Sequence, residues 1–246
     1  MTMAVRVPEP KAQAHQISIK ENDMNTYASV SDINNRMISV YNNMFLAVVN
    51  SMLVSLLVAS SPGLMAFLFT GIMKWVVIFA PLVMILTMTW IMQRATYGQA
   101  RAMLHVFAAL MGLSMSTIFI TFTTTSIVGA FFGAAVLFAT MSMWGYFTKK
   151  SLDSWGSFLL VGLIAVVITS VVNVFIGSST LAMVVSAVAI IVFLGLTAYD
   201  TQRIRIEVSI LEPDSKAEIL GALSLYMNFI NIFVSLLQLF GARNDD

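Results

Sequence analysis

Seven apolar segments follow one another along this chain, and each is about as long as the ~20 residues that a helix needs to cross ~30 Å of hydrocarbon. We expect each of them to form a membrane-spanning helix. An apolar linker at 62–73 can extend the second helix, lie in the interface or re-enter the membrane. The predicted fold class is an all-α integral membrane protein with seven transmembrane helices. The segments lie near 39–59, 75–92, 103–122, 127–147, 156–176, 181–203 and 217–240.

Composition agrees with a membrane protein and excludes several functions. The chain is 59% hydrophobic and only 10% charged, whereas soluble proteins carry about 25% charged residues. The net charge of +1 argues against a nucleic-acid partner, and the absence of cysteine excludes disulfides, thiol catalysis and thiolate metal sites. Residues 1–36 are polar and are predicted to form a disordered cytoplasmic tail. The seven-helix domain would cover 37–242, and 243–246 would be a short external tail.

Basic residues set the predicted orientation. They flank alternate connections between the apolar segments, whereas the remaining connections hold only Lys74. The positive-inside rule therefore places the N-terminus in the cytoplasm and the C-terminus outside. The flanking residues are Arg36, Arg94, Arg101, Lys149, Lys150, Arg203, Arg205 and Lys216.

The last apolar segment, "GALSLYMNFINIFVSLLQLFG", carries a polar residue on nearly every turn. Ser224, Asn228, Asn231, Ser235 and Gln238 follow one another at steps of four, three, four and three, which places them on one helix face. Polar groups in hydrocarbon cost free energy unless they find partners. Helix seven therefore lies in the middle of the bundle or lines a conduit. The same side chains can also serve only as hydrogen-bonding contacts between helices.

Asp200 is the only carboxylate that the segments can place inside the bilayer. It follows the uncharged segment 181–199 in "GLTAYDTQRI". An aspartate in the membrane costs roughly 2.5–3.5 kcal/mol on insertion scales and usually marks an ion or proton pathway. The alternative is that Asp200 is solvated at the cytoplasmic interface, because it lies one turn from Arg203.

Small residues indicate where helices can approach closely. "GAFFG", from Gly129 to Gly133, has the GxxxG spacing that brings two helix backbones together. "ALMGLSMS" in the third apolar segment is similar.

The motifs around Asp200 and Asn228 carry a family resemblance. "FLGLTAYDTQRI" followed by "GALSLYMNFINIFVSLLQLFG" resembles the transmembrane Bax inhibitor motif family, in its bacterial branch. "FAPLVM", "FAALMGLSMSTIF", "MSMWGYFTKKSLDSWGSFL" and "VVNVFIGSS" also match, so the resemblance covers about residues 35–242. It implies an inner-membrane protein whose helix seven is surrounded by the other six. It also implies conduction of ions, chiefly calcium, with sensitivity to pH.

In that family a pair of aspartates on helices six and seven forms a hydrogen-bonded latch. Asp200 matches the first aspartate, but "LYMNFIN" places Asn228 where the pattern has the second. An Asp–Asn pair has one ionisable group, so the coupled titration of two carboxylates is lost. The resemblance then implies a latch with weakened pH sensing and with Asp200 as a weak calcium ligand. Some relatives also pair an acid with a base on helix two. Helix two here has no acid, so the pair has no place in it, and Arg94 at its cytoplasmic end is the only nearby basic candidate.

These observations predict a multipass inner-membrane calcium leak channel. Asp200 and Asn228 would gate it, while Ser224, Asn231 and Ser235 would line or pack the path. The expected partners are the lipid bilayer and calcium or other cations, with no cofactor beyond transient calcium. The alternative is a non-transporting regulator whose tail binds a membrane-bound ATP-dependent protease or a stress-response partner. An intramembrane aspartyl protease needs a second aspartate on the next helix, which is absent, so we expect no enzyme activity.

Overall fold

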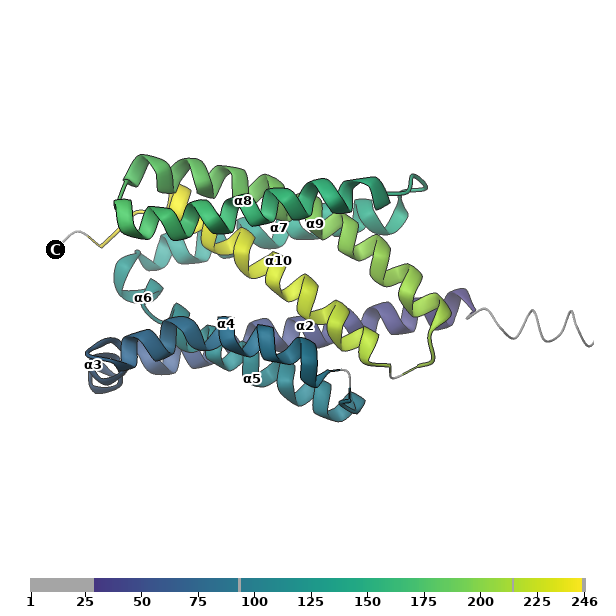
Figure 1. The fold of residues 1–246 in the computed structure, drawn as a ribbon, viewed down its shortest axis with the longest axis horizontal. Coiled ribbons are helices and arrows are strands. Elements are labelled where there is room, and N and C mark those ends of the chain that lie inside the picture. Colours follow the sequence, from purple (N-terminus) through teal and green to yellow (C-terminus); the bar gives the residue numbers. More distant parts are fainter. Residues whose placement is uncertain (1–28, 93, 214, 245–246) are drawn as a thin grey trace, which may run out of the picture.

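The all-α class is confirmed by a computed structural model, which describes residues 29–244 apart from Gln93 and Asp214 (Figure 1). Within that range there is no strand, only an isolated bridge between Phe122 and Arg243. Six helices are long and apolar enough to cross a membrane, or seven if α3 and α4 form one span. The helices are α2 (Val30–Ala59), α3 (Pro62–Phe69), α4 (Met73–Ile91), α5 (Tyr97–Met115), α6 (Ile118–Thr121), α7 (Thr124–Phe147), α8 (Asp153–Ile176), α9 (Ser179–Ile210) and α10 (Lys216–Phe240).

The first long helix, α2, begins at Val30 rather than near residue 39. Ser29 and Asp32 form a capping box, in which the Ser29 hydroxyl accepts from the Asp32 amide at 3.2 Å and the Asp32 carboxylate accepts from the Ser29 amide at 3.2 Å. Such reciprocal bonds satisfy amides that the first turn leaves free. The predicted end of the tail at residue 36 is therefore wrong, because 30–36 are helical. The rest of the predicted tail, 1–28, lies outside the described residues.

The linker 62–73 is helical over most of its length. Ser61 caps α3 and Pro62 occupies its first turn, a position that proline favours. Gly71 takes a left-handed φ of 57° in the turn that follows, and α4 then departs at 79° from α3.

At the other end of the chain, the Asn244 amide donates to the Thr121 carbonyl at 3.0 Å. Residues 243 and 244 are thus held against the start of α7, while 245–246 lie outside the described residues.

The helices form two layers with α10 crossing between them (Figure 1). One layer holds α7, α8 and α9, and the other holds α2, α4 and α5. α10 is the most buried span, with 67% of its membrane-length window inside the protein. It packs against α2, α5, α7 and α9, while α8 packs on α9 and α4 on α5. The main contacts of α10 are therefore with four helices, fewer than the six expected around it.

Two glycines allow the closest helix contacts. A Cβ on Gly112 of α5 would lie 2.5 Å from the Ser51 carbonyl oxygen, and one on Gly145 of α7 would lie 2.3 Å from the Ala198 carbonyl oxygen. Gly112 belongs to the "ALMGLSMS" segment. A Cβ on Gly129 would meet nothing within 4 Å. A Cβ on Gly133 would lie 3.4 Å from a Leu236 methyl carbon of α10. The "GAFFG" spacing therefore brings one glycine against a side chain of α10, while Gly129 lies on the exposed side of α7.

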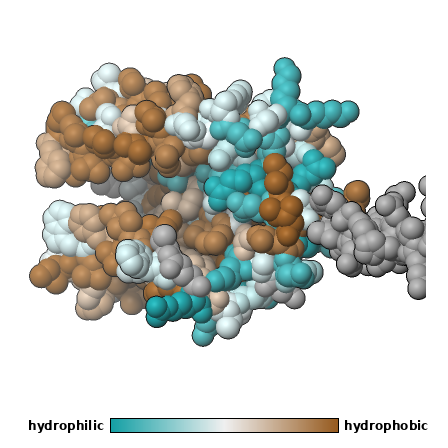
Figure 2. Space-filling view, turned by 45° about the vertical axis from the view of Figure 1, so that its right-hand side comes forward, coloured by the Kyte–Doolittle hydropathy of each residue, from teal (hydrophilic) through white to brown (hydrophobic). Residues whose placement is uncertain are grey.

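The surface divides into a charged end and an apolar remainder. Figure 2 shows hydrophilic residues gathered at the end where α2 begins, with hydrophobic residues over the rest of the visible face. We call the end at which α2, α5, α8 and α10 begin the charged end. At the opposite end, the described charged residues are Lys74 and Arg243. Residues near the charged end include Arg94, Arg101, Lys149, Lys150, Asp153, Arg203, Arg205, Glu207 and Lys216.

Candidate functional site

Asp200 of α9 and Asn228 of α10 meet in the bundle, as the family resemblance implies. The Asn228 Nδ2 atom donates to Asp200 Oδ2 at 2.7 Å. Their residues are 8% and 4% exposed, so both side chains are withdrawn from the surface. They meet because α9 and α10 pack together along most of their length. A buried carboxylate needs such a partner, since an unpaired one is costly in a low-dielectric interior. We call this hydrogen-bonded pair the latch.

Hydroxyl groups from three helices form a chain beside the latch. The Tyr41 hydroxyl lies 2.6 Å from the Ser142 hydroxyl, which lies 3.0 Å from the Thr201 hydroxyl. Thr201 directly follows Asp200 in α9. Tyr41 and Ser142 also line a cavity of about 300 Å³ between α2 and α7. Polar groups therefore extend from this cavity, in the half nearer the charged end, to the residue next to the latch.

The other polar residues of α10 behave differently from one another. Asn231 is half-buried and its Nδ2 donates to the Met227 carbonyl of its own helix at 2.8 Å. Gln238 accepts from the Ser186 hydroxyl of α9 at 2.9 Å. Ser224 is half-buried and Ser235 is buried. The predicted stripe therefore includes two contacts to α9, through Asn228 and Gln238, rather than one continuous polar line.

A fully buried tyrosine joins α10 to helices of the other layer. Tyr226 is 0% exposed, and its hydroxyl lies 2.7 Å from that of Ser51 on α2. Ser51 also donates to the Ala108 carbonyl of α5 at 2.7 Å. The contact between Tyr226 and Ser51 therefore connects α10 to the layer that holds α2, α4 and α5. No sequence pattern singled out Tyr226, because it lies off the polar stripe.

An aromatic layer lies between α7 and α10. Phe229 contacts Phe131 and Phe138 edge to face, with ring centroids 5.5 and 5.9 Å apart. Phe233 contacts Phe131 at 6.2 Å in the same manner. Phe229 directly follows Asn228 in α10, and Phe233 lies one turn further from the charged end. The layer therefore lies on the α7 side of α10, level with the latch and one turn beyond it.

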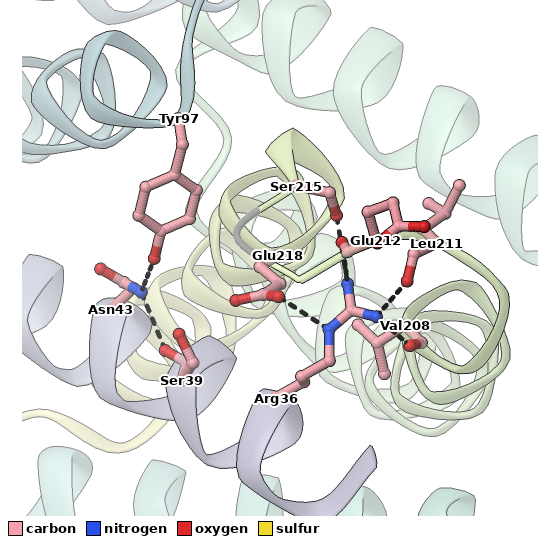
Figure 3. Close-up of polar contacts among 9 residues, drawn as sticks. All are labelled: Arg36, Ser39, Asn43, Tyr97, Val208, Leu211, Glu212, Ser215 and Glu218. Carbon is pink, nitrogen blue, oxygen red and sulfur yellow. Dashed lines mark hydrogen bonds and ion pairs between the residues drawn. The ribbon is translucent and has the colours of Figure 1, made fainter. Parts of the chain in front are cut away.

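A second polar cluster, missed by the sequence analysis, closes the charged end (Figure 3). Arg36 Nε donates to Glu218 Oε1 at 2.8 Å, and their side chains are 7% and 2% exposed. The same guanidinium donates to the carbonyls of Val208, Leu211 and Glu212 and to the Ser215 hydroxyl. It thus satisfies carbonyls that the end of α9 leaves without an intrahelical partner. We call this cluster the Arg36 clamp, and it joins α2, α9 and α10.

Arg94, the basic partner predicted from the sequence, takes no part in the Arg36 clamp. Arg94, the residue considered for that role, has an exposed side chain beyond the end of α4. The sequence marks Arg36 only as a basic residue that flanks a span and as the last residue of the predicted tail. Its partner Glu218 lies in the first turn of α10, 182 residues further along the chain. Their proximity depends on the tertiary fold, so no local pattern could indicate it.

The latch offers little for a resident metal ion. Within residues 29–244, Gln93 and Asp214 apart, no group of three or more His, Cys, Asp or Glu side chains is placed to hold one. Asp200 supplies a carboxylate and Asn228 an amide, whereas calcium takes six to eight oxygen ligands. The Asp200 and Asn228 side chains alone therefore supply fewer oxygen ligands than a calcium ion takes.

Comparisons with known proteins agree with this architecture. The family described as "Inhibitor of apoptosis-promoting Bax1" matches residues 33–245. The inner membrane protein YbhL of Escherichia coli K12 is 38% identical over 191 residues, which cover 75% of this chain and 82% of the relative. An uncharacterized protein of Rickettsia prowazekii, RP147, is 39% identical over 173 residues, covering 69% and 73%. One of Caulobacter vibrioides is 37% identical over 174 residues, covering 69% and 70%.

None of these three relatives carries the name of an enzyme. The name of the Escherichia coli relative, together with the apolar helices of this chain, supports a multipass protein of the inner membrane. The match to the family extends over all of the described helices except the first residues of α2. The chain therefore belongs to the Bax inhibitor family.

Proposed function

We propose that this protein conducts cations across the inner membrane beside α10, with calcium as the first candidate and the latch as the gate. The observation that carries the proposal is the buried hydrogen bond between Asp200 and Asn228, 2.7 Å long, on the most buried helix of the bundle. A carboxylate inside a membrane span is costly and is usually retained because ions or protons use it. A negative charge there attracts cations and repels anions.

The contacts around the latch support a path from the charged end. The cavity between α2 and α7 contains the Tyr41 and Ser142 hydroxyls, and Ser142 contacts Thr201 beside the latch. Beyond the latch, Ser224, Asn231 and Ser235 are the polar groups of α10 that would line or pack the path. The aromatic layer closes the route toward the opposite end. In this proposal the structure represents a closed state.

We also propose that the charged end faces the cytoplasm, because basic residues gather on the cytoplasmic side of membrane proteins. The membrane potential would then drive cations toward the charged end by roughly 2.3 kcal/mol per charge per 100 mV. With Asn228 neutral, the latch has a single ionisable group. Conduction should therefore respond less to pH than in a protein with a coupled pair of carboxylates.

The test is ion flux into liposomes that hold the purified protein, measured for calcium, potassium and protons between about pH 6 and 8. Asp200→Asn keeps the shape and the hydrogen bond but removes the charge. It should lower calcium flux about tenfold or more, since ~1.4 kcal/mol of lost attraction gives that factor. Asn228→Asp should introduce a pH-dependent component. Asp153→Asn is the matched control, because it removes one carboxylate charge at an exposed position in the first turn of α8, where the carboxylate only accepts from the Ser151 hydroxyl.

Two results would contradict the proposal. If Asp200→Asn leaves flux and its pH profile unchanged, the latch is not the gate. If the native protein passes none of the three ions, conduction itself is wrong, and a regulator that binds a membrane-bound protease becomes the better candidate. A pull-down from solubilised membranes, with and without residues 1–28, would then test the tail as the contact.

A further inference from the structure

A second cavity, of about 360 Å³, lies in the half of the bundle away from the charged end. It is formed by α2, α6, α7 and α10. Its rim includes side chains that are well exposed, such as Met52 at 42% and Phe132 at 65%. In a membrane-spanning bundle this surface meets lipid, so the cavity opens toward the hydrocarbon. Residues that line it include Val48, Ser55, Ile118, Phe131, Phe132 and Phe233.

One polar group in this apolar cavity is unsatisfied. Ser55 is 4% exposed, and its hydroxyl has no hydrogen-bond partner among the described residues. Ser51, one turn earlier in the same cavity, differs because its hydroxyl contacts the Ala47 and Ala108 carbonyls and the Tyr226 hydroxyl. A buried polar group without a partner costs about 1–3 kcal/mol and calls for an explanation. A bound molecule with a hydrogen-bond acceptor at this depth would supply one.

We propose that the cavity binds one acyl chain of a membrane phospholipid, whose ester carbonyl accepts a hydrogen bond from the Ser55 hydroxyl once this side chain turns from the cavity wall toward the lipid. Ser55 lies five residues before Ser60, the C-cap of α2, which is ~7 Å along the helix axis. That depth lies near the edge of the hydrocarbon, where the bilayer passes into its interfacial region and where the ester groups are. The aromatic and aliphatic lining suits the methylene chain that continues toward the membrane centre.

The bound chain would contact Phe131 and Phe233, which belong to the aromatic layer between α7 and α10. A phospholipid in this cavity therefore packs directly against the central helix. Its binding does not depend on ion conduction, since the cavity and Ser55 are separate from the latch. Loss of flux in the experiment above would leave this proposal standing.

The experiment is native mass spectrometry of the whole protein, extracted with mild detergent from liposomes of a diester phosphatidylglycerol. About one phospholipid should stay bound. Ser55→Leu, which fills the cavity and removes the hydroxyl, should abolish retention. Ser170→Leu is the matched control, because Ser170 lies exposed on α8 and its hydroxyl bonds its own helix. It should retain lipid as the native protein does.

A second comparison isolates the hydrogen bond and does not depend on the bulky substitution. Ser55→Ala should weaken retention about two- to tenfold, the factor expected for one hydrogen bond. A dialkyl ether phosphatidylglycerol, which lacks the ester carbonyl, should bind the native protein as weakly as the ester lipid binds Ser55→Ala. Combining the variant with the ether lipid should cause no further loss.

Three outcomes would overturn the proposal. The first is equal retention by the native protein and Ser55→Leu. The second is equal affinity for ester and ether lipids, together with no effect of Ser55→Ala. The third is a bound mass that belongs to a free fatty acid or to detergent instead of the phospholipid. A diazirine on the lipid chain gives a direct check, because its cross-links should concentrate on Val48, Phe131 and Phe233 rather than on exposed Ile191 of α9.

Discussion

Arg36→Met should destabilise the protein more than loss of any exposed ion pair, because it dismantles the Arg36 clamp from its centre. Met replaces the apolar stem of the arginine, as far as the Nε position, but removes every donor. Glu218 would remain buried, at 2% side-chain exposure, without its partner. The carbonyls of Val208, Leu211 and Glu212 would lose a donor at the end of α9.

Removal of one partner from a buried ion pair costs about 3–5 kcal/mol, and we expect Arg36→Met to fall in that range. Glu218→Gln should cost less, about 1–3 kcal/mol, since the amide oxygen still accepts from Arg36. The double variant Arg36→Met with Glu218→Leu leaves no buried charge. It should therefore be less destabilised than Arg36→Met alone, although the carbonyls of α9 stay uncapped.

The assay is reversible unfolding in mixed micelles with increasing dodecyl sulfate, followed by fluorescence of the four tryptophans. Arg203→Met provides the control, because Arg203 and Glu207 form an ion pair within α9 whose side chains are 50% and 34% exposed. Such pairs contribute about 0–1 kcal/mol. If Arg36→Met costs no more than this control, or if the double variant is at least as destabilised as Arg36→Met alone, the buried pair does not hold the charged end together.

Two further predictions concern packing and orientation. Gly145→Ala should destabilise the fold strongly, because its Cβ would lie 2.3 Å from the Ala198 carbonyl oxygen. Gly129→Ala has open space around the new Cβ and should be neutral or slightly stabilising. The same unfolding titration compares the two variants, and equal effects would refute the close contact at Gly145. In this cysteine-free chain, an impermeant thiol reagent added to intact cells should label Ala242→Cys but not Val30→Cys. The native Val30 is 74% exposed and lies at the charged end, so burial would not explain a lack of labelling. The reverse pattern would refute the proposed orientation.

The apolar segments of the sequence predict most of the helices, because a span must bury its length in hydrocarbon. They do not predict the start of α2, since the capped turn at Ser29 to Asp32 is polar and lies beyond the apolar run. The GxxxG spacing likewise does not say which face of a helix meets a neighbour. Gly145 makes the close contact in α7 although it belongs to no such pair.

The candidate site was predictable in part. Periodicity placed Asn228 on a polar face, and the resemblance paired it with Asp200. Asn231 lies on the same face, but its amide bonds a carbonyl one turn earlier in α10, a local solution that periodicity cannot distinguish from a contact between helices. The Arg36 clamp was not predictable, because it depends on where α2 lies against the turn between α9 and α10.

The polar contacts of α10 indicate which seam can open if ions cross beside it. Near the charged end the Arg36 clamp joins α9 and α10, the latch joins them midway, and Gln238 meets Ser186 near the far end. Twenty residues separate Glu218 from Gln238, about 30 Å of helix, so α9 and α10 are tied over the depth of a membrane. The two cavities described above both lie on the seam between α2 and α7. Separation of α7 from α2 and α10 would move the aromatic layer and leave the Arg36 clamp closed. Separation of α9 from α10 would instead have to break the Arg36 clamp, the latch and the hydrogen bond between Gln238 and Ser186. The proposed conduction therefore requires movement at the seam between α2 and α7, with the latch released locally by a cation that competes for Asp200.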